Sequence, residues 1–178
     1  INMTIDGYCD HTAGIADDEI HQHYNELLKS ADTVLYGSIT YQLMEYWTTI
    51  VKNPTGNKAM DEFAITMDNI SKIVFSHTLE NLTWNTATLA KRGLKEEVED
   101  IRQQAGRDIL VGSHSLIVSL TQLGLIDEYQ LCIHPVIAGK GLPLFKNITD
   151  QIKPTLLKTK TFGCGAIALY YEPIKKDA

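Results

Sequence analysis

Gly112, Ser113, His114 and Ser115 form a small polar turn between an apolar stretch and a helical repeat. A strained serine nucleophile at such a turn needs the pattern Gly-x-Ser-x-Gly, and the third residue from Gly112 is His114. A serine hydrolase is therefore not indicated. The turn suits an anion better, because the N–H groups of a first helical turn are free and Ser113 or Ser115 adds a hydroxyl donor. Capping of the helix by Ser113 is the structural alternative.

Two other apolar runs also end in small polar residues. The first run is followed by Gly37, Ser38 and Thr40, and the second by Ser76, His77 and Thr78. Two helix N-termini at the carboxyl ends of sheet strands can together hold a pyrophosphate. The hydroxyls and imidazole of the remaining turn could then meet a further phosphate or a ribose. The three turns together predict a nucleotide-binding edge.

The histidines near the chain start do not predict a metal site. His21 and His23 lie two residues apart on a predicted helix, where side chains at that spacing do not face each other. The acidic residues before them suit a solvated helix start. We expect no metal.

The elements that must position these turns follow from hydrophobic periodicity. Short apolar runs predict strands at 33–36, 72–75, 109–111 and 129–137. Apolar residues at helical spacing predict helices within 20–31, 94–105 and 116–123. Segments 155–161 and 166–172 predict a C-terminal antiparallel hairpin, and 48–57 is predicted to be a loop. Alternating strands and helices predict an α/β fold with a mostly parallel sheet and helices on both faces.

The composition limits the classes of protein to which the chain can belong. The chain has 178 residues, 44% hydrophobic and 21% charged, which predicts one globular domain over 1–178. A net charge of −6 argues against nucleic-acid binding. No apolar run approaches the roughly 18 residues of a membrane span. Three widely spaced cysteines without a CxxC pair favour a reducing compartment, so we expect a cytoplasmic protein.

The chain carries GLIDE at 124–128 followed by HPVIAGKGLPLF at 134–145. This pair of motifs is the most specific likeness to a known family: it resembles the reductase domain of riboflavin-biosynthesis deaminase-reductases and its stand-alone relatives, within the dihydrofolate reductase-like fold. Residues 3–8, 37–41, 76–78 and 161–173 resemble the family's first strand, two strand-end turns and closing hairpin. The resemblance implies a three-layer fold and an oxidoreductase that transfers hydride from NADPH.

The resemblance also implies roles for the turns. Those at Gly37 and Gly112 would hold the pyrophosphate, and Ser76, His77 and Thr78 would meet the adenosine 2′-phosphate. The predicted cofactor-binding residues are thus Gly37, Ser38, Thr40, Ser76, His77, Thr78, Gly112, Ser113 and Ser115. Gly7 and the loop after it would border the nicotinamide and the substrate.

Hydride transfer leaves the protein to orient the reactants and supply a proton. Asp6, beside the expected nicotinamide, is the first candidate for the proton donor, and Asp18 is the second. A structural Asp-Gly turn is the alternative for Asp6. The expected substrate is a small heterocycle, either pterin-like or a riboflavin precursor such as 5-amino-6-(5-phosphoribosylamino)uracil.

Two departures from the family bear on the cofactor. Ser38 stands where the family usually has Arg, and His77 where it has Arg or Lys, so two cationic contacts are lost or weakened. NADH is therefore possible beside NADPH. These losses also favour an alternative, a non-catalytic nucleotide- or flavin-binding dimeric module. Alternating apolar residues of the hairpin, Ile167, Leu169 and Tyr171, favour a homodimer.

Overall fold

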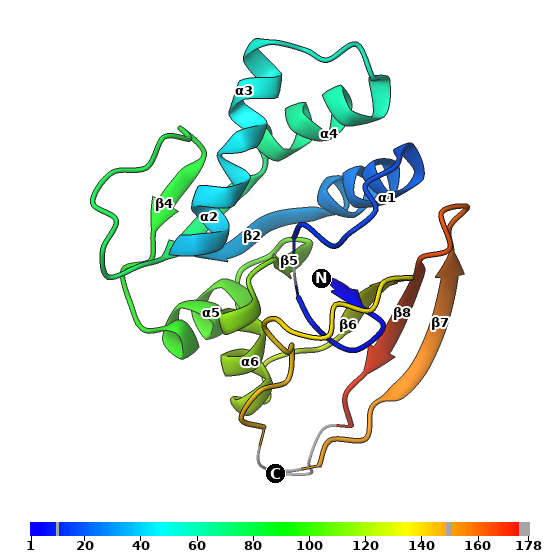
Figure 1. The fold of residues 1–178 in the computed structure, drawn as a ribbon. Helices are drawn as coiled ribbons and strands as arrows, with labels where there is room; N and C mark the ends of the chain where they lie inside the picture. Colours follow the sequence, from blue (N-terminus) through cyan, green and yellow to red (C-terminus); the bar gives the residue numbers. More distant parts are fainter. Residues whose placement is uncertain (10, 149–150, 175–178) are drawn as a thin grey trace. The chain divides into compact units, whose positions relative to one another are not determined.

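The computed structural model describes residues 1–9, 11–148 and 151–174 (Figure 1). The chain divides into two compact units, one made of residues 18–116 and one of residues 1–17 with 117–178. The prediction of a single domain over 1–178 stays a prediction.

The 18–116 unit is built on a parallel sheet of order β4-β3-β2-β5. Its strands are β2 (Ala31–Gly37), β3 (Ser71–Phe75), β4 (Ala87–Leu89) and β5 (Asp108–Val111). The central strand β2 pairs in parallel with both β3 and β5, and β3 pairs in parallel with β4. Because every pair is parallel, the carboxyl ends of these strands share one edge of the sheet.

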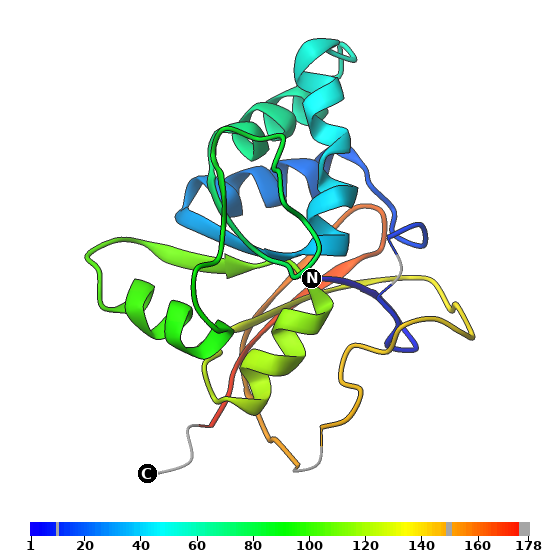
Figure 2. The same ribbon diagram turned by 90° about the vertical axis from the view of Figure 1, so that its left-hand side faces the viewer.

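Helices cover this sheet on both sides. They are α1 (Asp18–Lys29), α2 (Ser38–Met44), α3 (Tyr46–Lys52), α4 (Lys58–Asn69) and α5 (Leu94–Arg102). Figures 1 and 2 show α5 on the side of the sheet opposite α1, α3 and α4. Buried side chains such as Tyr36, Phe63 and Val74 form the core of the unit. Burial of such large apolar side chains is the main stabilising contribution.

The other unit carries a mixed sheet of order β1-β6-β8-β7. The strands are β1 (Asn2–Thr4), β6 (Tyr129–His134), β7 (Thr155–Thr161) and β8 (Ile167–Glu172). β1 pairs in parallel with β6, whereas β8 pairs antiparallel with both β6 and β7. Figure 1 shows β7 and β8 side by side as a hairpin. The boundary between the units falls inside α6 (His114–Gln122).

The α/β class, the mostly parallel pairing and the C-terminal hairpin are confirmed. β6 is shorter than the predicted 129–137, because Pro135 has no N–H to continue the ladder. In the part of the chain that the structure describes, no helix is long and apolar enough to cross a bilayer.

The predicted loop 48–57 is wrong in its first half, which belongs to α3. Pro54 and Gly56 lie in the short connection between α3 and α4, so these residues marked a turn rather than a long loop. Helix α4 was not predicted from the sequence; its N-cap Asn57 accepts a hydrogen bond from Met60 N–H. The short strand β4 was missed as well.

Candidate nucleotide-binding site

An open pocket of about 130 Å³ lies at the carboxyl edge of the parallel sheet in the 18–116 unit. It is lined by Gly37, Ser38, Ile39, Thr40, Phe75, Ser115 and Leu116. Gly37 ends β2, Phe75 ends β3, and Ser115 lies in the first turn of the helix that follows β5. Parallel α/β sheets bind their ligands at this edge. Four of the nine predicted cofactor-binding residues, Gly37, Ser38, Thr40 and Ser115, meet in this pocket.

Ser113 lies behind the pocket and joins two of the turns. Its side chain is buried, and its Oγ accepts a hydrogen bond of 2.8 Å from Gly37 N–H. The hydroxyl thus links the turn after β5 to the turn after β2. The Gly37 N–H already has an acceptor and is not a free donor for a phosphate. Ser113 therefore acts here by fixing the distance between the turns.

Gly112 has a packing reason to be glycine. A Cβ placed on it would lie 2.6 Å from Cε1 of Tyr36, far inside van der Waals contact. The Tyr36 ring is itself buried and fixed by a contact of its hydroxyl with Met67 Sδ. Close packing against Tyr36 thus accounts for a glycine at this position.

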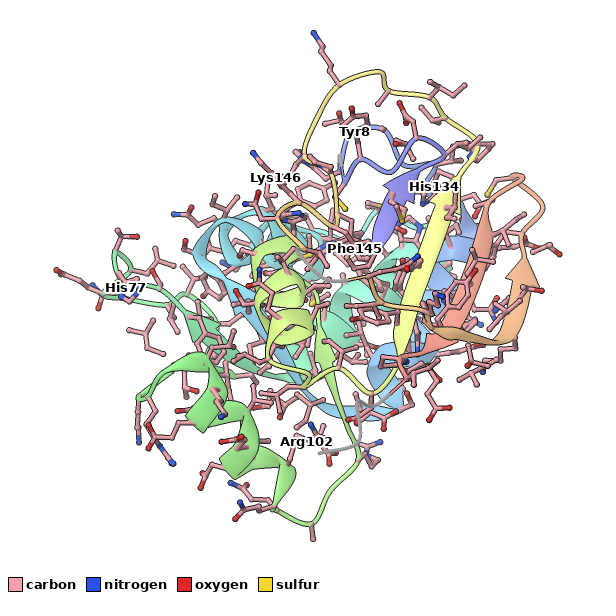
Figure 3. The ribbon with its side chains drawn as sticks, turned by 90° about the horizontal axis from the view of Figure 1, so that it is seen from below. Tyr8, His77, Arg102, His134, Phe145 and Lys146 are labelled. Atoms are coloured by element: carbon pink, nitrogen blue, oxygen red, sulfur yellow. The ribbon has the colours of Figure 1, made fainter. Side chains whose placement is uncertain are left out.

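The third turn lies outside the pocket lining, although its neighbour Phe75 is part of it. Ser76 Oγ accepts hydrogen bonds from the N–H groups of Thr78 and Leu79, so the turn is closed on itself. Figure 3 shows His77 at the outer end of this loop, and its side chain is exposed.

Asp6 belongs to the other unit and acts as a hydrogen-bond acceptor. Its Oδ1 accepts from Thr4 Oγ1 at 2.6 Å and from Ala138 N–H at 3.1 Å, while its Oδ2 accepts from Gly139 N–H at 2.7 Å. These hydrogen bonds, that from Thr4 above all, lower the pKa of Asp6 to about 2. The carboxylate is ionised at neutral pH and holds no proton to donate. This geometry corrects the role expected for Asp6.

Two segments far apart in sequence are held together around Asp6. Ile5 N–H donates to Val136 O at 2.9 Å, and Cys9 N–H donates to Leu142 O at 2.8 Å. Tyr8, labelled in Figure 3, forms an isolated bridge with Pro143. The family-like motifs at 3–8 and 134–145 therefore form one hydrogen-bonded structure, anchored by the Asp6 carboxylate.

Asp18, the second candidate acid, lies at the start of α1 in the 18–116 unit. Its Oδ1 accepts a hydrogen bond of 2.7 Å from Asn57 Nδ2, the N-cap side chain of α4. Asp18 is exposed and is not among the pocket-lining residues.

The apolar part of the pocket was missed from the sequence. Ile39, Phe75 and Leu116 line it, and Ile39 is 74% exposed. Ile39 lies in the first turn of α2, and an isoleucine between two hydroxyl residues at that helix start was the available signal in the sequence. Among the described residues, no group of three His, Cys, Asp or Glu side chains is arranged to hold a metal.

Comparison with known proteins places the chain among relatives. Residues 1–168 match the family described as the RibD C-terminal domain. The chain is 32% identical over 173 residues to YyaP of Bacillus subtilis strain 168, a protein named as uncharacterised, and the match covers 95% of this chain and 90% of YyaP.

Solved structures with a similar fold were also found. One is a Shewanella protein whose name assigns it provisionally to riboflavin biosynthesis, with TM-score 0.72 and 16% identity over 98% of this chain and 97% of that chain. Another is a Thermotoga maritima diaminohydroxyphosphoribosylaminopyrimidine deaminase/5-amino-6-(5-phosphoribosylamino)uracil reductase, with TM-score 0.65 and 16% identity. This second match covers 97% of this chain and 54% of the Thermotoga chain. At this identity the likeness concerns the fold.

Proposed function

This chain belongs to the RibD C-terminal domain family, and from that premise we propose that it is an NAD(P)H-dependent reductase. Its substrate is a small heterocycle of the 5-amino-6-(5-phosphoribosylamino)uracil type, the compound named for the Thermotoga relative. The observation that carries the proposal is the pocket at the ends of β2 and β3 and at the start of α6.

The pocket fits a phosphate-bearing part of a dinucleotide. The pocket is open and has a volume of about 130 Å³, which gives room for a phosphate group. Hydroxyls of Ser38, Thr40 and Ser115 supply donors. A Cβ on Gly37 would reach to 3.5 Å from Ser115 Oγ, so the glycine keeps the space between the two turns open.

The lining carries no Lys or Arg, so a bound phosphate is met by hydroxyls and backbone rather than by a cation. Charge-assisted hydrogen bonds are about twice as strong as neutral ones. We therefore propose modest affinity for the cofactor and use of both NADPH and NADH.

A nicotinamide, when bound, would supply the hydride, and the chain would orient the reactants. Ser38, Thr40 and Ser115 would hold the cofactor phosphates, and Ser113 keeps their two turns at a fixed spacing. The ionised Asp6 holds the backbone at Ala138 and Gly139 rather than delivering a proton. Asp18 is likewise an exposed hydrogen-bond acceptor outside the pocket lining, so its role as proton donor stays a prediction.

The proposal is tested by following the hydride. The protein is incubated with NADPH deuterated at the transferable position of C4 and with 5-amino-6-(5-phosphoribosylamino)uracil, and the reduced product is examined by mass spectrometry. We expect deuterium in the product and none after substitution Gly37→Val, which fills the pocket; circular dichroism checks the fold of this variant. If flavin nucleotide binds while no hydride is transferred, the non-catalytic module replaces the reductase.

A further inference from the structure

His134 is a buried imidazole whose contacts fix its tautomer. It lies on β6 with 1% of its surface exposed. Its Nδ1 accepts a hydrogen bond of 3.1 Å from Ile15 N–H, and its Nε2 lies 3.0 Å from Asn2 Oδ1. A backbone amide can only donate, so Nδ1 carries no proton. The proton therefore sits on Nε2 and is donated to the Asn2 side chain.

The ring also supports the backbone that it binds. A Cβ on Gly14 would lie 3.6 Å from Nε2 and 3.7 Å from Cε1 of His134, so the chain at Gly14 passes directly against the imidazole. Figure 3 shows His134 on the strand β6, and Ile15 comes from the segment that follows β1 and its turn. Through Gly14 and Ile15, residues 11–17, here called the 11–17 segment, thus pack against one neutral histidine.

We propose that His134 is a positioning residue whose neutral imidazole holds the 11–17 segment, and that protonation of Nδ1 at acidic pH releases this segment. A proton on Nδ1 removes the acceptor of Ile15 N–H and places two N–H donors against each other. This release does not depend on the proposed function.

Groups on each neighbouring element influence the pH at which the His134 ring is protonated. Burial lowers the pKa of His134, and the negative charge of Asp17, from the segment itself, opposes this lowering. From β6, Cys132 Sγ lies 3.7 Å from Nε2, and from β1 the partner Asn2 does not titrate. The Ile1 amine at the chain start interacts electrostatically with Cys132.

The sign of the pH effect follows from the lowered pKa. The closed arrangement binds fewer protons than the open one, in which the imidazole titrates near its ordinary value of about 6.5. The closed arrangement is therefore fully favoured above that pH and weakens as the pH falls below it.

Amide hydrogen exchange measured by NMR between pH 5 and pH 8 tests this inference on the protein without cofactor or substrate. We expect the protection factor of Ile15 N–H to fall below about pH 6.5, by up to about tenfold per pH unit. Gly139 N–H is the internal control, because its acceptor Asp6 has a pKa of about 2 and stays ionised throughout. Equal pH dependence of the two protection factors would overturn the proposal.

Two substitutions separate this role from simple packing. In His134→Asn the amide oxygen can replace Nδ1 as acceptor without titrating, so protection of Ile15 persists and loses its pH dependence. In His134→Ala protection is lost at every pH. Loss of protection in both variants would contradict the acceptor role. Should His134→Asn not fold, the ¹⁵N shifts of the wild-type ring decide, since the proposal requires an unprotonated Nδ1 at neutral pH.

Neither the amide protection factors nor the ring ¹⁵N shifts depend on hydride transfer. A protein that shows the expected Ile15 behaviour but reduces nothing disproves the proposed function and leaves the role of His134 standing.

Discussion

Lys72 is a charged residue buried in the 18–116 unit, with 0% of its surface exposed. Its Nζ donates to Ile70 O at 2.8 Å, to Thr86 Oγ1 at 2.9 Å and to Asp68 O at 3.3 Å. It also lies 4.4 Å from the centre of the Trp84 ring, a cation–π contact. The lysine thus ties the C-terminal end of α4 to the connection that leads into β4.

Because Lys72 is buried, the free energy of unfolding depends measurably on pH. Desolvation lowers the pKa of Lys72 from 10.5 to about 8, so between these values the unfolded chain binds more protons than the folded one. The free energy of unfolding should therefore rise with pH across that interval. We expect denaturant titrations at several pH values to show this rise relative to Lys72→Met, which lacks the titrating group. Parallel curves for the two proteins would contradict this expectation.

His77 bears on the choice between NADPH and NADH. If it meets the 2′-phosphate, a permanently charged guanidinium at this position strengthens NADPH binding and leaves NADH binding unchanged. His77→Arg should raise the ratio of NADPH to NADH affinity, measured by calorimetry, by about tenfold, since a charged hydrogen bond contributes about 1.5 to 3 kcal/mol. An unchanged ratio in this variant would exclude a place for residue 77 beside the 2′-phosphate.

At the scale of elements, the strand-end turns were visible in the sequence because each follows a short apolar run. The runs near 33–36, 72–75 and 109–111 became β2, β3 and β5, and four predicted residues meet in one pocket. The hydrogen bond between Gly37 N–H and Ser113 Oγ was not predictable, because it joins residues 76 positions apart. Local patterns carry no information on such a pairing.

Roles that depend on tertiary contacts were missed or misassigned for the same reason. Asp6 has the sequence context of an acid beside a glycine turn, and only its contacts with Ala138 and Gly139 reveal an anchor. The motif at 134–145, which contains those two residues, was recognised in the sequence, but its hydrogen bonding to residues 4–9 was not. Helix α3 was not predicted from the sequence because the turn-forming residues Pro54 and Gly56 follow it closely.

The turn after β5 gives a prediction about stability. Gly112→Ala places a methyl group 2.6 Å from the buried Tyr36 ring, which must move. We expect a loss of about 1 to 3 kcal/mol in the free energy of unfolding, as for other overpacked sites. Gly93→Ala is the matched control, because a Cβ there meets nothing within 4 Å and its φ of −64° suits alanine. Equal denaturation midpoints for both variants would refute the packing explanation.

At the scale of the whole molecule, the edge strand β7 favours self-association. All seven residues of β7 are exposed, including Leu156 at 50% and Leu157 at 48%. An open strand edge with exposed leucines is suited to pairing with a second copy. We propose a homodimer through the β7–β8 hairpin.

Light scattering at micromolar concentration should give twice the chain mass of 19.9 kDa. The double substitution Leu156→Lys and Leu157→Lys should give the monomer mass, since it replaces the two exposed leucines of the proposed contact with charged side chains. Leu123→Lys, at a leucine 42% exposed beyond the end of α6, should remain dimeric. A wild type of monomer mass would contradict the proposed assembly.

Thermal unfolding with added cofactor tests whether the pocket at the carboxyl edge of the parallel sheet binds a nicotinamide dinucleotide, as we propose. NADPH at about 100 times its dissociation constant adds about 2.7 kcal/mol of stability, a shift of several degrees. We expect this shift with NADPH, a comparable one with NADH, and neither in Gly37→Val. An unchanged unfolding temperature with both nicotinamides, at concentrations up to millimolar, would contradict the claim.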